Sequence, residues 1–277
     1  MTRETIDLRL DGHVAHVVLK RGEAFNTMTP AFWREIRDVF AEVDATPDVR
    51  VVVLSATGRH FTAGMDLSVF TTLTPAGSRD EGRRREALRR SVLEYQESFN
   101  AVERCRVPVL AAIQGGCIGG GVDLIAACDM RYATEDAWMC IQEINIGIVA
   151  DVGTLQRLPH LMPEGMVREL AYTGRRLGAA RALSLGIVNE VFADHAAMME
   201  GVTAIAREIA AQSPLAVAGS KEMLNYTRDH SVADGLNYIA TWNAGMLTST
   251  DMAEAMAARQ EKRAPVFENL LPVTRRA

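Results

Sequence analysis

Three acidic side chains in the middle of the chain lie in surroundings that are apolar or built of small residues. Asp123 follows three consecutive glycines at 119–121 and precedes leucine and isoleucine, Glu143 follows a strand-like segment, and Asp151 lies between alanine and valine. A lone carboxylate buried among such residues costs roughly several kcal/mol unless it is paired or used in chemistry. Low-dielectric surroundings raise the pKa of a carboxyl group, so that it can exchange protons near neutral pH. The pattern indicates general acid–base chemistry.

Structural pairing is the competing interpretation of the same three acids. Acids that form ion pairs or cap helices outnumber functional ones, and such pairs also perturb pKa values. The arginines available for pairing are Arg131, Arg157 and Arg168. Because the three acids share one glycine-rich region, acid–base chemistry is favoured over structural pairing.

The glycine run itself predicts a site for negative charge. An apolar strand expected to end at Ile113 leads into a glycine-rich turn, and the apolar segment Val122–Cys128 follows Gly119–Gly121. Uncovered backbone N–H groups at the positive end of a helix dipole stabilise charge on a ligand oxygen. The Ala63–Gly64 turn, which follows another expected strand, would let a second backbone N–H approach the same ligand.

Longer segments carry a resemblance to a known family. They are Gly115–Ile125, Cys128–Tyr132, Ala150–Pro159 and Arg228–Val232. Together they resemble the crotonase (enoyl-CoA hydratase/isomerase) superfamily, and within it the dienoyl-CoA isomerases, which convert a 3,5-dienoyl-CoA to a 2,4-dienoyl-CoA in fatty-acid β-oxidation. The resemblance covers nearly the whole chain.

The resemblance implies roles for the acids and for both glycine-containing turns. Glu143 matches the base that removes a proton from carbon 2 of the acyl group, and Asp151 matches the acid that delivers a proton to carbon 6. Asp123 takes the place of a catalytic glutamate of the hydratases. The backbone N–H groups of Met65 and Gly120 would hold the thioester oxygen. The implied contacts with the acyl-CoA are Ala63, Gly64, Met65, Asp66, Leu67 and Gly120.

The acids at 123 and 151 favour an isomerase over a hydratase. A hydratase uses two glutamates to hold one water, and an aspartate at 123 withdraws one carboxylate by about one methylene, roughly 1.5 Å. Asp151 supplies a further proton-transfer point, where hydratases usually carry a small residue. Isomerisation is therefore the predicted reaction. An enoyl-CoA hydratase is the alternative, and a non-catalytic crotonase-fold scaffold or RNA-binding protein is a third interpretation.

Composition limits the class of protein. The 277 residues are 48% hydrophobic and 23% charged, which is typical of a globular protein, and the formal net charge of −5 argues against a nucleic acid partner. Signal-peptide, membrane-spanning and C-terminal Ser-Lys-Leu patterns are not apparent, and the four cysteines lack a C-x-x-C spacing. These features predict a cytoplasmic protein with free thiols, without membrane contact or a metal site. The resemblance adds that no cofactor is needed, because coenzyme A is part of the substrate.

Strand and helix signals predict an α/β fold. Strands and helices alternate in the first half of the chain, which favours a mostly parallel sheet; the resemblance specifies the crotonase fold, with its spiral of ββα units. The expected elements are a hairpin of Ile6–Leu10 and Val14–Leu19, strands Val51–Leu54, Val107–Ile113 and Met130–Ala133, a helix from Thr29 to Val43, and a charged helix from Asp80 to Arg104.

The last third of the chain is expected to be helical. Predicted helices cover residues 163–173, 179–185, 195–212, 214–229, 231–246 and 249–262, with one strand over Ile187–Phe192. We therefore divide the chain into a crotonase core with the acyl-CoA site, residues 1–195, and a helical region, residues 196–277. Apolar stripes in this region fit a core or a subunit contact, and the resemblance implies a trimer or a hexamer.

Overall fold

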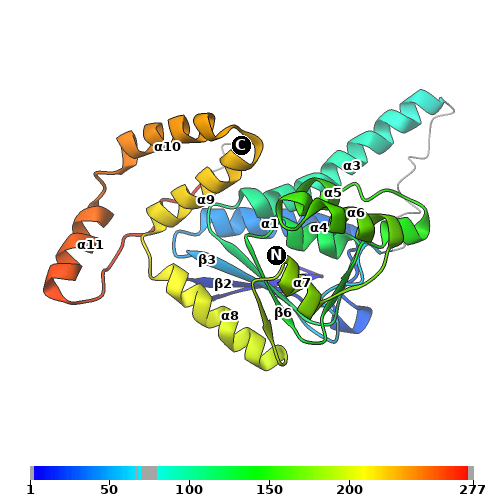
Figure 1. Ribbon diagram of the computed structural model, residues 1–277, viewed down its shortest axis with the longest axis horizontal. Coiled ribbons are helices and arrows are strands. Elements are labelled where there is room, and N and C mark those ends of the chain that lie inside the picture. Colours follow the sequence, from blue (N-terminus) through cyan, green and yellow to red (C-terminus); the bar gives the residue numbers. More distant parts are fainter. Residues whose placement is uncertain (1–2, 67, 70–79, 274–277) are drawn as a thin grey trace.

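A six-stranded sheet forms the centre of the computed structural model, which describes residues 3–66, 68–69 and 80–273 (Figure 1). Its strand order is β1-β2-β3-β4-β6-β9, in which β1 is antiparallel to β2 and the remaining neighbours are parallel. The strands are β1 Ile6–Asp11, β2 Val14–Leu19, β3 Val51–Ala56, β4 Val109–Ile113, β6 Met130–Thr134 and β9 Glu190–Phe192. The predicted α/β class with a mostly parallel sheet is confirmed.

A second, smaller sheet lies beside the first and supports the glycine-rich turn. It consists of β5 (Gly116–Ile118), β7 (Trp138–Cys140) and β8 (Leu177–Gly178). β5 runs parallel to β7, and β7 is antiparallel to β8. The short strand β5 thus leads directly into the helix that follows the glycines.

The central strand β3 shows why the main sheet is covered on both faces. All six of its residues are buried. Val52 and Leu54 belong to the apolar core shared with helices α1 (Pro30–Ala45) and α3 (Glu81–Arg104). Val51 and Val53 pack on the other face with α8 (His195–Ala210). Side chains alternate between the faces of a strand, so a continuous apolar run requires helices on both sides.

Helices α1 and α3 begin where the sequence predicts. The side chain of Thr29 accepts a hydrogen bond from the backbone N–H of Phe32, and Pro30 occupies the first turn of α1. Asp80 caps α3 in the same way. Only the C-terminal part of α3 is buried, through Phe99 and its neighbours, and the N-terminal part projects from the body (Figure 1).

Two predicted strands are shorter than expected. The first starts at Val109 instead of Val107, because Pro108 has no N–H and contributes only its carbonyl, to Val52. The second covers only Glu190–Phe192, because the N–H groups of Ile187 and Val188 bond to the end of helix α7 (Ala179–Leu185) rather than to a strand.

The C-terminal helices confirm the predicted helical character of this region. They are α6 Glu164–Thr173, α7, α8, α9 Pro214–Asp229, α10 Val232–Met246 and α11 Thr250–Glu261. α10 and α11 extend away from the body (Figure 1), and we call residues 232–261 the arm. The chain then returns to the body, where Arg50 donates to the carbonyl of Phe267 and Arg106 to that of Leu271. The boundary between residues 1–195 and 196–277 stays a prediction, and α8, which spans it, packs on the sheet.

Candidate active site

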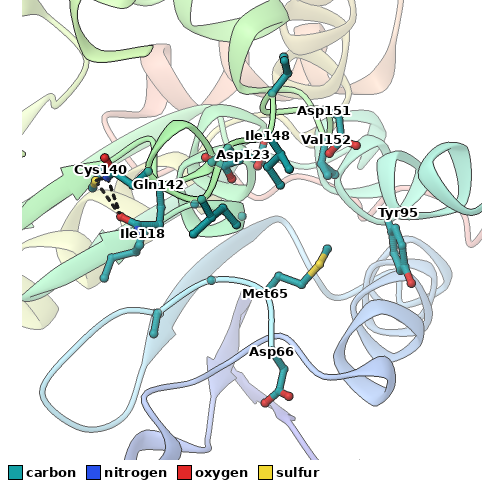
Figure 2. A pocket seen from close by; sticks show the side chains of 18 of the residues that line it. Met65, Asp66, Tyr95, Ile118, Asp123, Cys140, Gln142, Ile148, Asp151 and Val152 are labelled. Atoms are coloured by element: carbon teal, nitrogen blue, oxygen red, sulfur yellow. Dashed lines mark hydrogen bonds between the residues drawn. The ribbon is translucent and has the colours of Figure 1, made fainter. Parts of the chain in front are cut away.

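A cavity of about 1090 Å³ lies between the loop that follows β3, the glycine-rich turn and the side of α3. It brings together residues from both candidate oxyanion turns and all three acids named by the sequence. In Figure 2, Asp123 and Asp151 lie across the cavity from Met65, with Tyr95 of α3 at one side. The cavity is therefore large enough, and chemically equipped, to bind an extended substrate with an apolar part.

Two backbone N–H groups meet at one end of this cavity. Helix α4 (Gly120–Ala126) starts directly after Gly119, whose φ is +53°. Within the described chain, the N–H groups of Gly120 and Met65 have no hydrogen-bond acceptor. Their two turns are in close contact, since a Cβ on Gly64 would lie 3.5 Å from the Gly120 nitrogen and 2.6 Å from the Ile118 oxygen. These two donors form a candidate oxyanion hole.

Glu143 lies beside the start of α4. It begins the short 3-10 helix η2 (Glu143–Ile146), and a Cβ on Gly119 would lie 3.1 Å from its Oε1. Its Oε2 is buried and accepts no hydrogen bond within the described part of the chain. Burial, reinforced by the charge of Asp123, raises the pKa of Glu143 to about 7. A half-buried carboxylate with a free oxygen and this pKa fits a general base.

Asp123 is the most buried of the three acids. It lies in the first turn of α4 and is 1% exposed. Its Oδ1 accepts a hydrogen bond of 2.6 Å from the backbone N–H of Thr154, the first residue of helix α5 (Thr154–Arg157). Burial raises the pKa of Asp123 to about 6, although the hydrogen bonding by Thr154 opposes the increase. Asp123 is thus connected directly to the loop that carries Asp151.

Asp151 lies at the exposed rim of the cavity, on the loop of residues 151–154 before α5. Gln96 of α3 donates a 2.7 Å hydrogen bond to its backbone carbonyl. Desolvation raises the pKa of Asp151. The three acids therefore share a cavity, and each has a pKa above its ordinary value.

The structure does not support the pairing of these acids with arginine. Among the residues that the structure describes, none of the three acids forms an ion pair. Arg131 donates to backbone carbonyls, among them those of Cys128 and Ile187, while Arg157 pairs with Glu103 and Arg168 with Glu164. The arginine pairing considered for Asp123, Glu143 and Asp151 is therefore absent from the described residues, whereas the alternative of helix capping holds for Asp123, which accepts from the first N–H of α5.

The remaining predicted contacts have different surroundings. Ala63, Gly64 and Met65 line the cavity. Asp66 also borders it, but its carboxylate accepts hydrogen bonds from the Thr27 hydroxyl at 2.9 Å and from Ser68. These bonds lower the pKa of Asp66, and Figure 2 shows the side chain pointing away from the acids. Leu67 lies outside the described residues.

One wall of the cavity was not anticipated from the sequence. Leu88, Val92 and Tyr95 of α3 line it, on a helix that the sequence marks mainly by its charges. Arginines of α3 do pair with glutamates of the same helix, as at Arg85 and Glu81. The 4- and 7-residue spacing of Leu88, Val92 and Tyr95 places them on one helix face and was the available signal.

Comparisons with known proteins show the family. Residues 9–270 match the enoyl-CoA hydratase/isomerase family, so the chain belongs to this family. It is 44% identical over 271 residues to the peroxisomal Delta(3,5)-Delta(2,4)-dienoyl-CoA isomerase of Arabidopsis thaliana, which covers 97% of this chain and 98% of that one. It is 46% identical over 254 residues to the mitochondrial enzyme of that name from Homo sapiens, covering 91% and 77%. The predicted resemblance is thereby confirmed.

A solved structure shows the same fold. The chain resembles the crystal structure of an enoyl-CoA hydratase from Bacillus anthracis, with a TM-score of 0.86 and 31% identity, over 96% of this chain and 99% of that chain. The crotonase fold predicted from the sequence is therefore confirmed.

The predicted cytoplasmic location is contradicted by these relatives. The names of the Arabidopsis and human proteins place them in peroxisomes and mitochondria. Buried free thiols, which the structure does contain, do not identify a compartment. Short targeting signals, which are recognised by receptors, do not change the overall amino-acid composition. No helix in the described ranges is long and apolar enough to cross a membrane.

Proposed function

We propose that this protein converts a 3,5-dienoyl-CoA to a 2,4-dienoyl-CoA, a step of fatty-acid β-oxidation. The observation that carries the proposal is the pair of proton-exchanging groups in one cavity, Glu143 beside the oxyanion donors and Asp151 on a separate loop near α3. The higher identity to named dienoyl-CoA isomerases, 44–46%, than to the hydratase structure, 31%, supports it.

The reaction moves one proton off the acyl chain and returns another farther along it. The Glu143 carboxylate takes a proton from carbon 2, and the released electrons delocalise to the thioester oxygen, which accepts hydrogen bonds from the N–H groups of Met65 and Gly120. The conjugated dienolate then takes a proton at carbon 6 from the carboxyl group of Asp151. The carbonyl reforms, and the two double bonds now begin at carbons 2 and 4 instead of carbons 3 and 5. Coenzyme A enters with the substrate, and no cofactor is required.

The rate of isomerisation is expected to show two pH limbs of opposite sign. Glu143 acts as a carboxylate, so kcat/KM should fall on the acid side, where this group, with its pKa raised to about 7, is increasingly protonated. Asp151 acts as a carboxylic acid, so kcat/KM should also fall on the alkaline side, where this group is increasingly ionised. Initial rates over a pH series check both limbs. A profile without an acid limb would contradict the assignment of Glu143.

Replacement of Gly120 tests the oxyanion hole. A Cβ at this position would lie 2.9 Å from the sulfur of Met28, a fully buried side chain, so Gly120→Ala should displace the N–H donor. Loss of one such donor typically lowers kcat about 10²–10³-fold, and we expect a fall of about 10²-fold for displacement alone. Gly165→Ala, where a Cβ meets nothing within 4 Å, is the matched control. Equal activity of the two variants would place the oxyanion donor elsewhere.

The direct test of the function is an assay with two substrates. Purified protein mixed with a 3,5-dienoyl-CoA should produce the absorbance of the 2,4-diene. Hydration of a 2-enoyl-CoA at a comparable rate would instead support the second candidate, an enoyl-CoA hydratase, which the likeness to the Bacillus anthracis structure favours. Asp123 and Glu143 would then hold the attacking water.

We also propose that the chain assembles as a trimer or as a hexamer of two trimers. Many large apolar side chains on α9 and in the arm are exposed in the single chain, and water contact with so much apolar surface is unfavourable. They are Leu224, Val232, Leu236, Met246, Leu247, Met252 and Met256. This helical part of residues 196–277 is the proposed contact surface.

Light scattering is expected to give three or six times the chain mass of 30.3 kDa. Charged substitutions at two of the most exposed positions, Leu224→Glu and Leu236→Glu, should shift the mass towards that of one chain. A wild-type mass of 30.3 kDa would contradict the proposed assembly without affecting the proposed reaction.

A further inference from the structure

The loop of residues 151–154 is fixed by three side chains that are not its own. Gln96 donates to the carbonyl of Asp151 at 2.7 Å, and Asp123 accepts from the N–H of Thr154 at 2.6 Å. Between these two contacts, Nη1 of Arg157 lies 3.4 Å from the carbonyl oxygen of Val152. The backbone from Asp151 to Thr154 is thus held by side chains that come from outside the loop.

Arg157 is itself held by α3. Its Nη2 donates to Oε2 of Glu103 at 2.8 Å and to Asn100 at 2.7 Å, and its Nε donates to Oε1 of Glu103 at 3.2 Å. The arginine side chain is 10% exposed and that of Glu103 is 19% exposed. This is a bidentate pair away from solvent, a geometry that the planar guanidinium provides and an ammonium group does not.

Gly153 shows that the loop is built around the guanidinium. Its φ is +133°, a conformation that L side chains rarely adopt, and a Cβ there would lie 1.9 Å from Nη1 of Arg157. The close approach of Arg157 to the backbone therefore requires glycine at 153. An arginine that served only to join α3 and α5 would not need to lie so close to the backbone at Gly153.

A second arginine pairs with the same glutamate of α3 but forms no hydrogen bond to the loop. Nη2 of Arg228, on α9, lies 2.7 Å from Oε1 of Glu103, and its side chain is 26% exposed. Among the described residues, Arg228 forms no hydrogen bond or ion pair with residues 151–154. The two arginines thus share one carboxylate but differ in contact with the loop that carries Asp151.

We infer that Arg157 is a positioning residue for the proton transfer at carbon 6, holding the 151–154 loop so that the Asp151 carboxyl group faces the acyl chain. This inference rests on the proposed isomerase function. Loss of Arg157 should affect only one of the two proton transfers, because Glu143 and the two oxyanion donors lie on other elements. Displacement of the loop should impair protonation at carbon 6 and leave removal of the carbon 2 proton intact.

The experiment compares Arg157→Lys with Arg228→Lys. Both substitutions keep the positive charge, and both replace the planar guanidinium and its several N–H donors by a single ammonium group. Two rates are measured on each variant: isomerisation of a 3,5-dienoyl-CoA, and exchange of the carbon 2 proton in deuterated water. For Arg157→Lys we expect kcat for isomerisation to fall about 10²-fold, the cost of a displacement of about 1 Å, with KM and the exchange rate close to wild type. For Arg228→Lys we expect both rates to match wild type.

A third variant covers the case in which Arg157→Lys does not fold. Gly153→Ala leaves every charge in place and separates the loop from the guanidinium, so it should show the same selective loss. Gly12→Ala, in the turn between β1 and β2, is its control, because Gly12 also has a positive φ but open space around the Cβ position.

The outcomes separate the inference from the function on which it rests. Full isomerisation by Arg157→Lys and by Gly153→Ala would overturn the inference, and so would an equal fall in isomerisation and exchange in the folded variants, because that pattern indicates general destabilisation. Wild-type protein that does not isomerise a 3,5-dienoyl-CoA would overturn the proposed function itself, before any variant is compared.

Discussion

Glu143→Gln should lower isomerisation by at least about 10⁴-fold, the upper range for loss of a general base. Glutamine has nearly the same shape but cannot accept the carbon 2 proton, and Glu143 is the acid whose carboxyl group lies against Gly119, next to the oxyanion donor Gly120. Exchange of the carbon 2 proton in deuterated water should be lost together with isomerisation. Both rates can be followed on the same sample, by absorbance and by mass spectrometry.

Glu169→Gln is a suitable control for this variant. Glu169 is a glutamate on α6 that pairs with Arg175 at the surface and does not line the cavity. Its replacement should leave both rates unchanged. Retention of carbon 2 exchange by Glu143→Gln would show that another group removes this proton, and Asp123 would be the first to test.

Asp151→Asn should lower isomerisation about 10²–10⁴-fold, since asparagine keeps the size and polarity of the side chain but has no proton to transfer to carbon 6. Exchange at carbon 2 should continue, because Glu143 and the oxyanion donors remain in place. Glu143→Gln is therefore expected to stop the removal of the carbon 2 proton, whereas Asp151→Asn is expected to stop the protonation of carbon 6.

The pH dependence gives an independent check of Asp151. The alkaline limb of the isomerisation profile should disappear from the residual activity of Asp151→Asn, because the group whose raised pKa causes it is gone. Normal isomerisation by this variant would refute the role of Asp151. Rapid hydration of a 2-enoyl-CoA would point to the hydratase alternative.

The sequence was most informative where local patterns decide the structure. The apolar run of β3 predicted a strand covered on both faces, and Thr29 with Pro30 predicted the start of α1. The glycines at 119–121 predicted the helix start that presents free N–H groups. In each case the physical cause lies within a few residues of its effect, so an isolated sequence suffices.

The sequence could not show relations that depend on distant packing. The partner of Arg157 is Glu103, 54 positions earlier in the chain, and nothing near either residue indicates the other. Likewise the carboxylate of Asp66 bonds to Thr27, 39 positions away, and nothing near Asp66 in the sequence indicates this partner. The strand expected from Ile187 was too long because buried apolar residues pack equally well outside a β-ladder.

The arm is attached to the body at both of its ends. Before it, Lys221 of α9 pairs with Asp129 in the body at 2.7 Å; after it, the returning chain is held by Arg50, by Arg106 and by the bond from Val273 to Asp44. A single proteolytic cut in the turn between α10 and α11 would therefore leave two fragments that remain together in native buffer and separate only on denaturation. Each half of the arm would therefore stay attached to the body of its own subunit through its own end, even when the backbone between the two helices is broken.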